Sequence, residues 1–395
     1  MFAISQIARK VLTRLFAVLS LLWLAACDAT GVTMGGGGGG QPIDPGAPVA
    51  VALLVPHGSS APGEAALARD LEAAARLAVA DLSGVRIDLR VYGTAGQPGQ
   101  AQQAALNAVA DGAKIIIGPL HAESANAVAV AVAPKNVNVL AFSNNPTIAG
   151  GNLFVLGQTF DNTADRLTRY AVRQGKRRIL TVSSNNLAGQ LGAQAIAKAA
   201  ANSGAQIVGN VGYDFSQEGV VAAVPQITQT ASSNSADAVF LTANSAGALP
   251  LFAQMLPENG LNPATTQYIG LSRWDSPPQT LELPGLQGGL FALPDQGKAQ
   301  RFRARFAQTN GNQPHPIAGL AYDGIAAVGA LVKTGKRDAL SRASLTQSAG
   351  FQGVDGVFRL RQDGTNQRGL AVATVRDNRV VIVDPAPQGF GGAGF

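Results

Sequence analysis

The sequence predicts an α/β protein with two lobes, each built on a mostly parallel sheet. Three observations predict it. Short apolar runs alternate with longer stretches of helical period, this rhythm restarts near Thr163, and 46% of the 395 residues are hydrophobic. Such a share of apolar residues fills a substantial core and excludes a disordered chain, and the length predicts two to three domains.

The first half of the chain predicts four strands separated by three helices. Short apolar runs predict strands at 49–55, 86–92, 114–117 and 137–142. Helices are expected at 100–111 and 124–132, and an earlier one is expected because apolar residues recur on one stripe, at Leu67, Leu71, Ala74, Ala78 and Leu82. Strand followed by helix is the pattern of βαβ units, so these strands are expected to lie parallel.

The second half repeats the pattern and then changes it. Helices are expected at 163–174, at 187–202, from about Val220, from Gly247, at 301–308 and at 318–333. Strands are expected at 178–182, 205–208, 238–241 and 267–269. The last three strands, at 356–360, 370–375 and 379–383, are predicted to be antiparallel around the Asp363-Gly364 turn.

The N-terminus has the pattern of a signal peptide. Arg9, Lys10 and Arg14 precede an apolar run of about a dozen residues that ends in Ala25-Ala26, too short to span a bilayer. We expect residues 1–26 to be removed, which leaves 27 basic and 24 acidic residues scattered along the chain. So small an excess of positive charge argues against nucleic-acid binding.

The only cysteine, Cys27, excludes intrachain disulfides and cysteine-based zinc sites. It follows Leu24-Ala25-Ala26, which resembles the lipobox of bacterial lipoproteins. This resemblance implies acylation of Cys27 and an extracytoplasmic protein anchored to a membrane. Asp28 resembles the signal that retains lipoproteins in the inner membrane, although inner and outer membranes both stay open.

Two segments are too rich in glycine and proline to be expected to fold. Residues 27–48, which contain six consecutive glycines, predict a flexible tether, and residues 385–395 predict a disordered tail. In that tail Phe390 and Phe395 are candidates for contact with a partner.

The segments Val51–Pro56 and Asp111–Leu120, with the Gly/Ser loop and long helix between them, resemble the type 1 periplasmic binding fold of leucine/isoleucine/valine-binding proteins. The resemblance covers nearly all of residues 49–384. It implies two Rossmann-like lobes joined by a three-crossing hinge. Lobe one is then expected to comprise residues 49–156 and 294–335, and lobe two residues 157–293 and 336–384.

Within that fold, six segments are similar to penicillin-binding-protein activator lipoproteins: Gln174–Arg178, Tyr268–Asp275, Ala321–Gly324, Gly353–Leu360, Asp363–Thr365 and Arg368–Leu370. This similarity implies a non-enzymatic lipoprotein that regulates peptidoglycan synthesis by binding a penicillin-binding protein. The fold itself supports an alternative, a substrate-binding lipoprotein that delivers an amino acid or a similar small polar ligand to the permease of an ABC importer.

The resemblance also implies a ligand cleft between the lobes, at the carboxyl ends of the strands. The candidate residues in its loops are His57, Ser59, Ser60, His121, Ser124, Ser143, Asn144, Arg273 and Trp274. Each is equally a residue of an ordinary polar turn, and Trp274 either stacks on a ligand or anchors the core or hinge. Ala122 stands where amino-acid-binding relatives hold the ligand carboxylate with a hydroxyl, and loop 183–187 lacks their tyrosine.

Nothing in the sequence predicts an enzyme. It contains no Gly-x-Ser-x-Gly elbow, Walker loop, Gly-x-Gly-x-x-Gly fingerprint or His-Glu-x-x-His helix. None of the three histidines has another at metal-ligand spacing, although His57 and His121 both fall in cleft loops. We therefore expect no catalytic residue, metal or cofactor. Asp355 and Asp363 each precede a glycine, and turn formation accounts for both.

Overall fold

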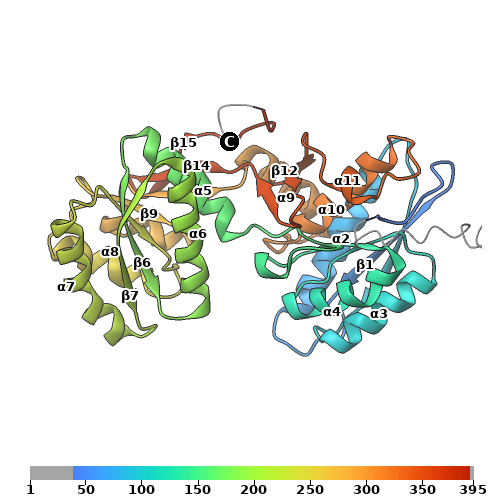
Figure 1. Cartoon of the computed structure of the whole chain (residues 1–395), viewed down its shortest axis with the longest axis horizontal. Helices are drawn as coiled ribbons and strands as arrows, with labels where there is room; N and C mark the ends of the chain where they lie inside the picture. The colour runs from blue at the N-terminus through green and yellow to red at the C-terminus, as the bar shows by residue number, and fades with distance from the viewer. Residues whose placement is uncertain (1–38, 392–395) are drawn as a thin grey trace, which may run out of the picture. The chain divides into compact units, whose positions relative to one another are not determined.

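The computed structural model describes residues 39–391, which form two α/β lobes and a small third sheet (Figure 1). The predicted fold class, parallel-rich sheets in two lobes, is confirmed. The predictions for the signal peptide, for Cys27 and Asp28 and for Phe395 fall outside the described residues.

Lobe one is built on a five-stranded, entirely parallel sheet in the order β2-β1-β3-β4-β5. Its strands are β1 (Val49–Val55), β2 (Ile87–Gly93), β3 (Ile115–Ile117), β4 (Asn138–Ala141) and β5 (Leu153–Val155). Its helices are α2 (Glu64–Asp81), α3 (Pro98–Ala110), α4 (Ala122–Val132), α9 (Gln296–Asn310) and α10 (Gly319–Val332). Because side chains alternate along a strand, the odd-numbered residues of β1 join the core with α2 and α10, whereas Ala52 and Leu54 join the core with α3 and α4.

Lobe two, green and yellow at the left of Figure 1, is built on a seven-stranded mixed sheet in the order β15-β14-β10-β9-β8-β6-β7. The parallel strands are β6 (Arg178–Ser184), β7 (Gln206–Tyr213), β8 (Ala238–Leu241), β9 (Gln267–Gly270) and β10 (Leu290–Leu293). The strand β14 (Ala371–Arg376) pairs antiparallel with β10, and β15 (Arg379–Asp384) pairs antiparallel with β14. The helices are α5 (Phe160–Arg173), α6 (Leu187–Ser203), α7 (Gln217–Ser233) and α8 (Leu249–Glu258).

The end of the chain departs from the predicted pattern. The Asp363-Gly364 turn joins only β12 (Gly356–Leu360) to β13 (Asn366–Arg368), which with β11 (Phe351–Gly353) form the third sheet. The prediction that all three final strands surround this turn is wrong, because β14 and β15 pair through a second turn at Asp377-Asn378 and belong to lobe two. The short strands β5, β10, β11 and β13 were not predicted from the sequence.

The third crossing between the lobes lies further along the chain than expected. From the sequence, all of residues 336–384 are expected to belong to lobe two. The segment with α11 (Arg342–Leu345), β11 and β12 instead packs into the core of lobe one through Leu340, Leu345, Phe351, Phe358 and Leu360. The chain therefore crosses at 156–159, at 294–295 and at 369–370, and only β14 and β15 return to lobe two.

The end of the expected tether is ordered. Ile43 is buried in the core of lobe one, and its backbone N–H donates to the Arg337 carbonyl at 2.8 Å. Gly40 has a φ of 70°, and a Cβ there would lie 2.3 Å from the Leu340 carbonyl oxygen. Only glycine allows so close an approach, so the prediction of a flexible tether is wrong for residues 40–48.

The expected tail is likewise ordered up to residue 391. Arg166 donates to the Pro385 carbonyl at 3.1 Å, Ala386 is buried, and the guanidinium of Arg359 lies 4.6 Å from the centre of the Phe390 ring. The prediction of disorder is therefore wrong for residues 385–391, and Phe390 already has a partner within the chain.

A buried ion pair and two buried amides connect the crossings. The Arg368 guanidinium donates to the Leu156 carbonyl at 2.6 and 3.0 Å and to the Asp323 carboxylate of α10 at 3.1 Å. Asn366 donates to the Val155 and Gly157 carbonyls at 2.8 Å each, and Asn162 of α5 donates to the Asn366 side-chain oxygen at 2.8 Å. The first and third crossings are thus tied to each other and to α10.

Burial raises the pKa of Asp323 to about 6, because desolvation outweighs the attraction of Arg368. Since this folded-state value lies above the ordinary 3.8, the protonated carboxyl is the form that the fold favours. The contribution of Asp323 to the free energy of unfolding is therefore complete below pH 4 and is lost as the pH rises through about 6.

We expect Arg368→Met to lower the free energy of unfolding by about 3 to 5 kcal/mol at pH 7.5, because it leaves the Asp323 carboxylate buried without a counterion. The loss should shrink at pH 5, where Asp323 takes up a proton. Urea unfolding at both pH values measures it. Arg376→Met, at an exposed arginine of β14, is the matched control, with an expected change within about 0.5 kcal/mol. Equal losses for Arg368→Met at both pH values would contradict this account.

The core of lobe two is built around Trp274. Its side chain is fully buried, and its indole stacks on Phe291 with the ring centres 5.6 Å apart. Two glycines make room for the ring: a Cβ would lie 2.2 Å from the indole nitrogen at Gly270 and 2.4 Å from a ring carbon at Gly289. Glycine is therefore required at both positions by the volume of one side chain.

Gly270→Ala should destabilise the protein by about 2 kcal/mol, because the added methyl group displaces an indole that has no free space. Gly99→Ala on α3 is the matched control, since a Cβ there meets nothing within 4 Å. Alanine is favoured over glycine within helices, so the control should be neutral or stabilising. Urea unfolding followed by far-UV circular dichroism compares the two, and equal stabilities would refute the packing argument.

Candidate functional site

Loops at the carboxyl ends of the first three strands of lobe one bring some of the candidate residues together. His121, the residue before α4, lies with its Nε2 2.8 Å from the Glu64 Oε1 at the start of α2. Ser59, Glu64 and His121 all approach Gly96, where a Cβ would lie within 3.5 Å of each side chain. The structure therefore joins Ser59 and His121 at one place.

His57 forms a separate pair. Its Nε2 lies 2.8 Å from Oε2 of Glu72, two turns further along α2, and Arg76 contacts the other oxygen of the same carboxylate. Burial acts to raise the pKa of Glu72, but the hydrogen bonds from His57 and Arg76 outweigh it and lower the pKa. The two histidines thus contact different carboxylates, and no contact between them is found within residues 39–391.

The candidate hydroxyls mostly stabilise their own turns. Ser59 accepts from the Ala61 N–H and Ser143 from the Asn145 N–H, both at 3.1 Å. Ser60 and Asn144 are exposed. Ser124 is 1% exposed, and its hydroxyl has no hydrogen-bond partner among the described residues, so it lies inside lobe one rather than on its surface.

Arg273 and Trp274 are adjacent in sequence but differ in environment. Trp274 lies in the core of lobe two, so the interpretation of it as a ligand-stacking residue is wrong and the core anchor is the correct alternative. Arg273 is partly exposed and makes a two-pronged hydrogen bond to Asp275 at 2.6 and 2.9 Å. Of the pair, only Arg273 contributes to a cavity.

That cavity, of about 270 Å³, lies between residues of both lobes. Arg273 and Ser276 line it from lobe two, and Asp355 lines it from the turn between β11 and β12. The other lining residues come from the second crossing, from α9 and from the segment that leads into α10: Pro294, Gln296, Ala299, Phe302, Arg303, Pro314, His315, Pro316 and Gly319.

Asp355 is the polar group of this cavity that lacks a partner. No hydrogen bond or ion pair reaches its carboxylate from any described residue, although its own carbonyl accepts from the Asp295 N–H at 2.8 Å. Burial raises the pKa of Asp355, while Arg368, Arg273 and Arg303 act in the opposite direction. A carboxylate held beside three cations without contacting them is open to a ligand.

From the sequence, turn formation accounts for both Asp355 and Asp363, but the structure shows that their carboxylates have different surroundings. Asp363 accepts from the Thr365 N–H at 2.9 Å and from its hydroxyl at 2.6 Å, as a turn residue does. Asp355 also lies in a turn, between β11 and β12, but its carboxylate makes no such bond. A sequence signal existed, because Asp363 is followed two residues later by threonine and Asp355 by valine.

Arg303 of α9 lines the same cavity, and no partner is found for its guanidinium in the described part of the chain. The cavity therefore presents one free carboxylate and one free guanidinium, with Phe302 and three prolines as apolar lining. These groups are complementary to a small molecule that carries both an ammonium and a carboxylate group. Sequence reasoning missed Arg303 because an exposed helical arginine has no distinctive pattern.

The described residues contain neither a candidate metal site nor a helix that could span a membrane. No group of three or more His, Cys, Asp and Glu residues between 39 and 391 is placed to hold a metal ion. Within the same range, every helix is too short or too polar to cross a bilayer.

Comparison with known proteins gives a family and a fold. A family model described as periplasmic binding protein matches residues 48–379. No curated protein matches the sequence. Similar solved structures include a putative branched-chain amino acid ABC transporter from Rhodospirillum rubrum, with 17% identity and a TM-score of 0.71 over 85% of this chain and 100% of that one.

Two further structures agree with that result. A branched-chain amino acid ABC transporter periplasmic ligand-binding protein from Burkholderia xenovorans is 18% identical, with a TM-score of 0.67 over 87% of this chain and 97% of that one. An ABC transporter substrate-binding protein from Desulfitobacterium hafniense in complex with Leu is 17% identical, with a TM-score of 0.61 over 85% and 100%. At these identities the similarity shows the fold. With the family match over most of its length, the chain belongs to the periplasmic binding protein family, has the type 1, Leu/Ile/Val-binding-like fold, and is by that membership extracytoplasmic.

Proposed function

We propose that this protein is the substrate-binding component of an ABC importer and that it captures a small zwitterionic solute, of the amino-acid class, in the cavity between its lobes. The observation that carries the proposal is the cavity of about 270 Å³ with an unpartnered carboxylate, Asp355, and an unpartnered guanidinium, Arg303, in its walls.

The charges of the cavity favour a ligand of this class. A partly buried carboxylate that accepts no hydrogen bond is costly, and a ligand ammonium group would supply the missing hydrogen bonds to Asp355. The planar guanidinium of Arg303 matches a carboxylate in a two-pronged contact. A molecule with both groups can therefore contact both Asp355 and Arg303, whereas a simple cation or anion can contact only one of them.

The position of the cavity is suited to capture. Arg273 belongs to lobe two, while Arg303 and Asp355 belong to segments packed on lobe one. A ligand that contacts both sides binds best when the two sides are close, and it shifts the population toward such a state. The volume of about 270 Å³ is below the range typical of drug-sized ligands, which favours a solute as small as a single amino acid.

The solved relatives support the same class of ligand. Two of the similar structures are described as branched-chain amino acid transporter proteins, and a third was determined in complex with Leu. Delivery to an importer also needs a location near the membrane, and acylation at Cys27 would provide it. We include the lipid anchor in the proposal on the basis of the lipobox resemblance.

A second candidate function, activation of a penicillin-binding protein, is favoured by one feature of lobe one. Ala122, the first residue of α4, has no hydroxyl for a ligand carboxylate, and neighbouring polar groups are already engaged, His121 with Glu64 and Ser59 with Ala61. Under this alternative the lobes present a surface to a peptidoglycan synthase and no solute needs to be captured.

The proposal predicts that a free amino acid raises the melting temperature of the protein. At a ligand concentration of 100 Kd the added stability is about 2.7 kcal/mol. A thermal-shift panel of the common amino acids, each from 10 μM to 10 mM, tests it. Asp355→Asn and Arg303→Gln should each weaken binding at least about tenfold, because each removes a charge-assisted contact.

Arg376→Gln, at an exposed arginine outside the cavity, is the control and should bind as the unaltered protein does. If no amino acid shifts the melting temperature, or if Asp355→Asn and Arg303→Gln leave the shift unchanged, the assignment of this cavity is wrong.

The two candidate functions predict different partners. In-cell crosslinking of a tagged protein with Cys27 intact, followed by mass spectrometry, should recover an importer permease if the proposal is correct. Recovery of a penicillin-binding protein without a permease would replace it with the second candidate. Cys27→Ser is the control for the anchor, and we expect it to move the protein out of the membrane fraction because the acylated position is lost.

A further inference from the structure

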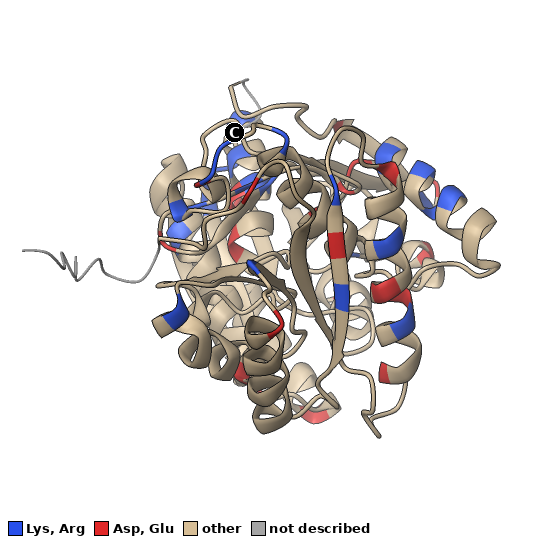
Figure 2. Ribbon diagram, turned by 90° about the vertical axis from the view of Figure 1, so that its right-hand side faces the viewer, with Lys and Arg blue, Asp and Glu red and all other residues tan. Residues whose placement is uncertain are grey.

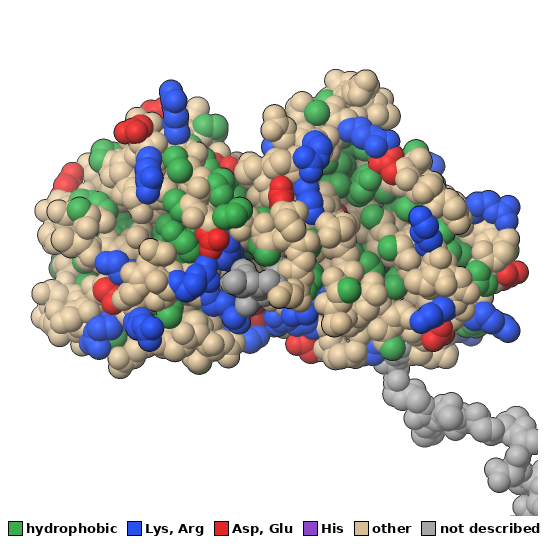
Figure 3. Space-filling model, turned by 90° about the horizontal axis from the view of Figure 1, so that it is seen from above, with side chains coloured by type: hydrophobic (Ala, Val, Ile, Leu, Met, Phe, Trp, Pro, Cys, Tyr) green, Lys and Arg blue, Asp and Glu red, His purple; other side chains and the backbone are tan. Residues whose placement is uncertain are grey.

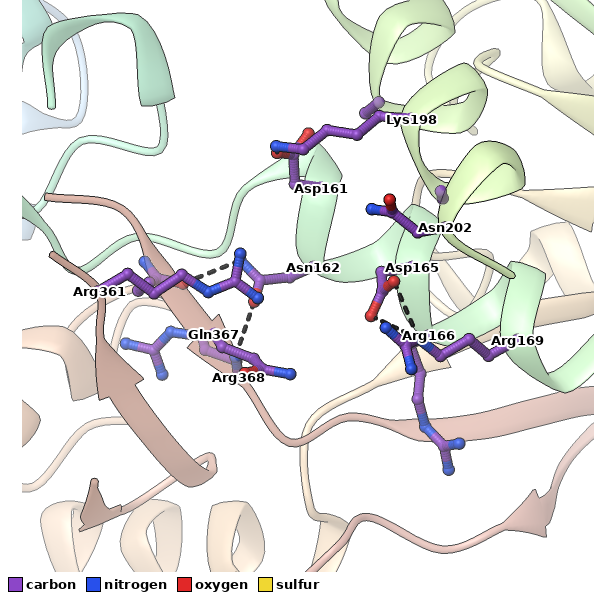
Figure 4. A pocket seen from close by; sticks show the side chains of 13 residues that line it. Asp161, Asn162, Asp165, Arg166, Arg169, Lys198, Asn202, Arg361, Gln367 and Arg368 are labelled. Carbon is purple, nitrogen blue, oxygen red and sulfur yellow. Dashed lines mark hydrogen bonds and ion pairs between the residues drawn. The ribbon is translucent and has the colours of Figure 1, made fainter. Parts of the chain in front are cut away.

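A second, smaller cavity lies where the third sheet meets lobe two, away from the cavity of Asp355. It has a volume of about 80 Å³ and is lined by α5, by α6 and by the β12–β13 hairpin (Figure 4). Its polar lining residues are Asp161, Asn162, Asp165, Arg166, Arg169, Lys198, Asn202, Arg361, Asn366, Gln367 and Arg368. In Figure 2, basic residues gather near the C-terminal end of the trace, and Figure 3 shows basic side chains clustered around the middle of the face seen there.

Most charges around this cavity are already matched. Lys198 pairs with Asp161 at 2.6 Å, and Arg169 pairs with Asp165 through two hydrogen bonds at 2.9 and 3.0 Å. Arg368 contacts Asp323, as described above. These pairs leave the local charge close to neutral before the last cation is counted.

Arg166 of α5 is matched in the same way. Its guanidinium donates to Asp384 at 3.0 Å and to the Leu370 carbonyl at 2.6 Å, both outside the cavity. Arg166 is therefore part of the wall of the cavity rather than a free donor within it.

Arg361 is the cation that remains. No hydrogen bond or ion pair of its side chain is found within residues 39–391, and Figure 4 shows the guanidinium extending from the hairpin toward Asn162. Burial acts to raise the pKa of Asp363, but its hydrogen bonds with Thr365 and the charges of Arg361 and Lys198 outweigh it and lower the pKa, so both cations lie near this turn. The Asp363 carboxylate would repel an anion there. Two hydrogen bonds from Thr365 fix this carboxylate in its own turn.

Two amide groups add donors. The Gln367 side chain is 8% exposed, and its oxygen accepts from Arg359 at 2.7 and 2.9 Å, which directs its NH₂ group away from Arg359. Neither this NH₂ group nor the side chain of Asn202 makes a hydrogen bond to any described residue. Asn202 is exposed and Gln367 is mostly buried, and the free N–H groups of both amides are available to a ligand.

From this geometry we infer that the cavity is a binding site for a small oxyanion, with phosphate as the chemical class that fits it. The Arg361 guanidinium supplies the charge, and the amides of Gln367 and Asn202 supply further N–H donors. A volume of about 80 Å³ holds several water-sized groups but is less than a third of the amino-acid cavity. A bound oxyanion would connect the β12–β13 hairpin to α6 across the hinge. This site is independent of the proposed solute site.

Isothermal titration calorimetry with inorganic phosphate, at constant ionic strength, tests the inference on the protein of residues 27–395. We expect saturable binding at one site, weakened about tenfold to a hundredfold by Arg361→Gln and abolished by Asn202→Asp, which places a carboxylate in the cavity. Arg376→Gln removes an equally exposed arginine elsewhere and should leave phosphate affinity unchanged.

A parallel titration with glycerol 3-phosphate separates two sources of the same group. Equal or tighter binding of the ester assigns the site to phosphate carried by a larger molecule, whereas binding of inorganic phosphate alone assigns it to the free ion. Absence of saturable heat with both compounds, or an equal loss of affinity in Arg361→Gln and Arg376→Gln, would overturn the inference. Far-UV circular dichroism of each variant excludes misfolding as the cause, and amino-acid binding is unaffected by either outcome.

Discussion

The structure depends on one buried contact, the ion pair of Arg368 with Asp323 at the hinge. The side chains of both are at most 5% exposed, and the guanidinium also donates twice to the Leu156 carbonyl of the first crossing. A buried charge that loses its partner costs several kcal/mol, so α10, β13 and the first crossing are held in one arrangement. The buried amides of Asn162 and Asn366 extend this constraint to α5 of lobe two.

The same ion pair positions the candidate solute site. The second oxygen of Asp323 accepts from the Val354 N–H at 2.8 Å, and Gly353 packs so tightly on this carboxylate that a Cβ would lie 2.6 Å from it. The turn that carries Asp355 is therefore attached to the hinge. Burial and the nearby Asp355 carboxylate both act to raise the pKa of Asp323, so a ligand cation at Asp355 would also change the electrostatics of the hinge pair. Under the proposed function, solute binding would therefore be coupled to the hinge through Asp355 and Asp323.

Most individual elements could be predicted from the sequence, because their signals are local. The apolar run of β1 and the apolar stripe of α2 each lie within one turn-bounded segment, and the structure has both at the expected places. The candidate site was predictable only in part. Arg273 lines the cavity, whereas Trp274 next to it is a core residue, because glycines at positions 270 and 289 leave the space that its indole fills.

The sequence by itself determined the fold class, the position of most of the longer strands and helices, and the resemblance to the periplasmic binding proteins, since these follow from periodicity and from short local motifs. The tertiary structure decided the position of the third crossing and the difference between Asp355 and Asp363. It also decided that residues 40–48 and 385–391 pack against the lobes. Apart from the hydrogen bonds of Asp363, which lie within its own turn, these outcomes depend on partners distant in sequence, and a local pattern carries no information about which distant group supplies the missing contact.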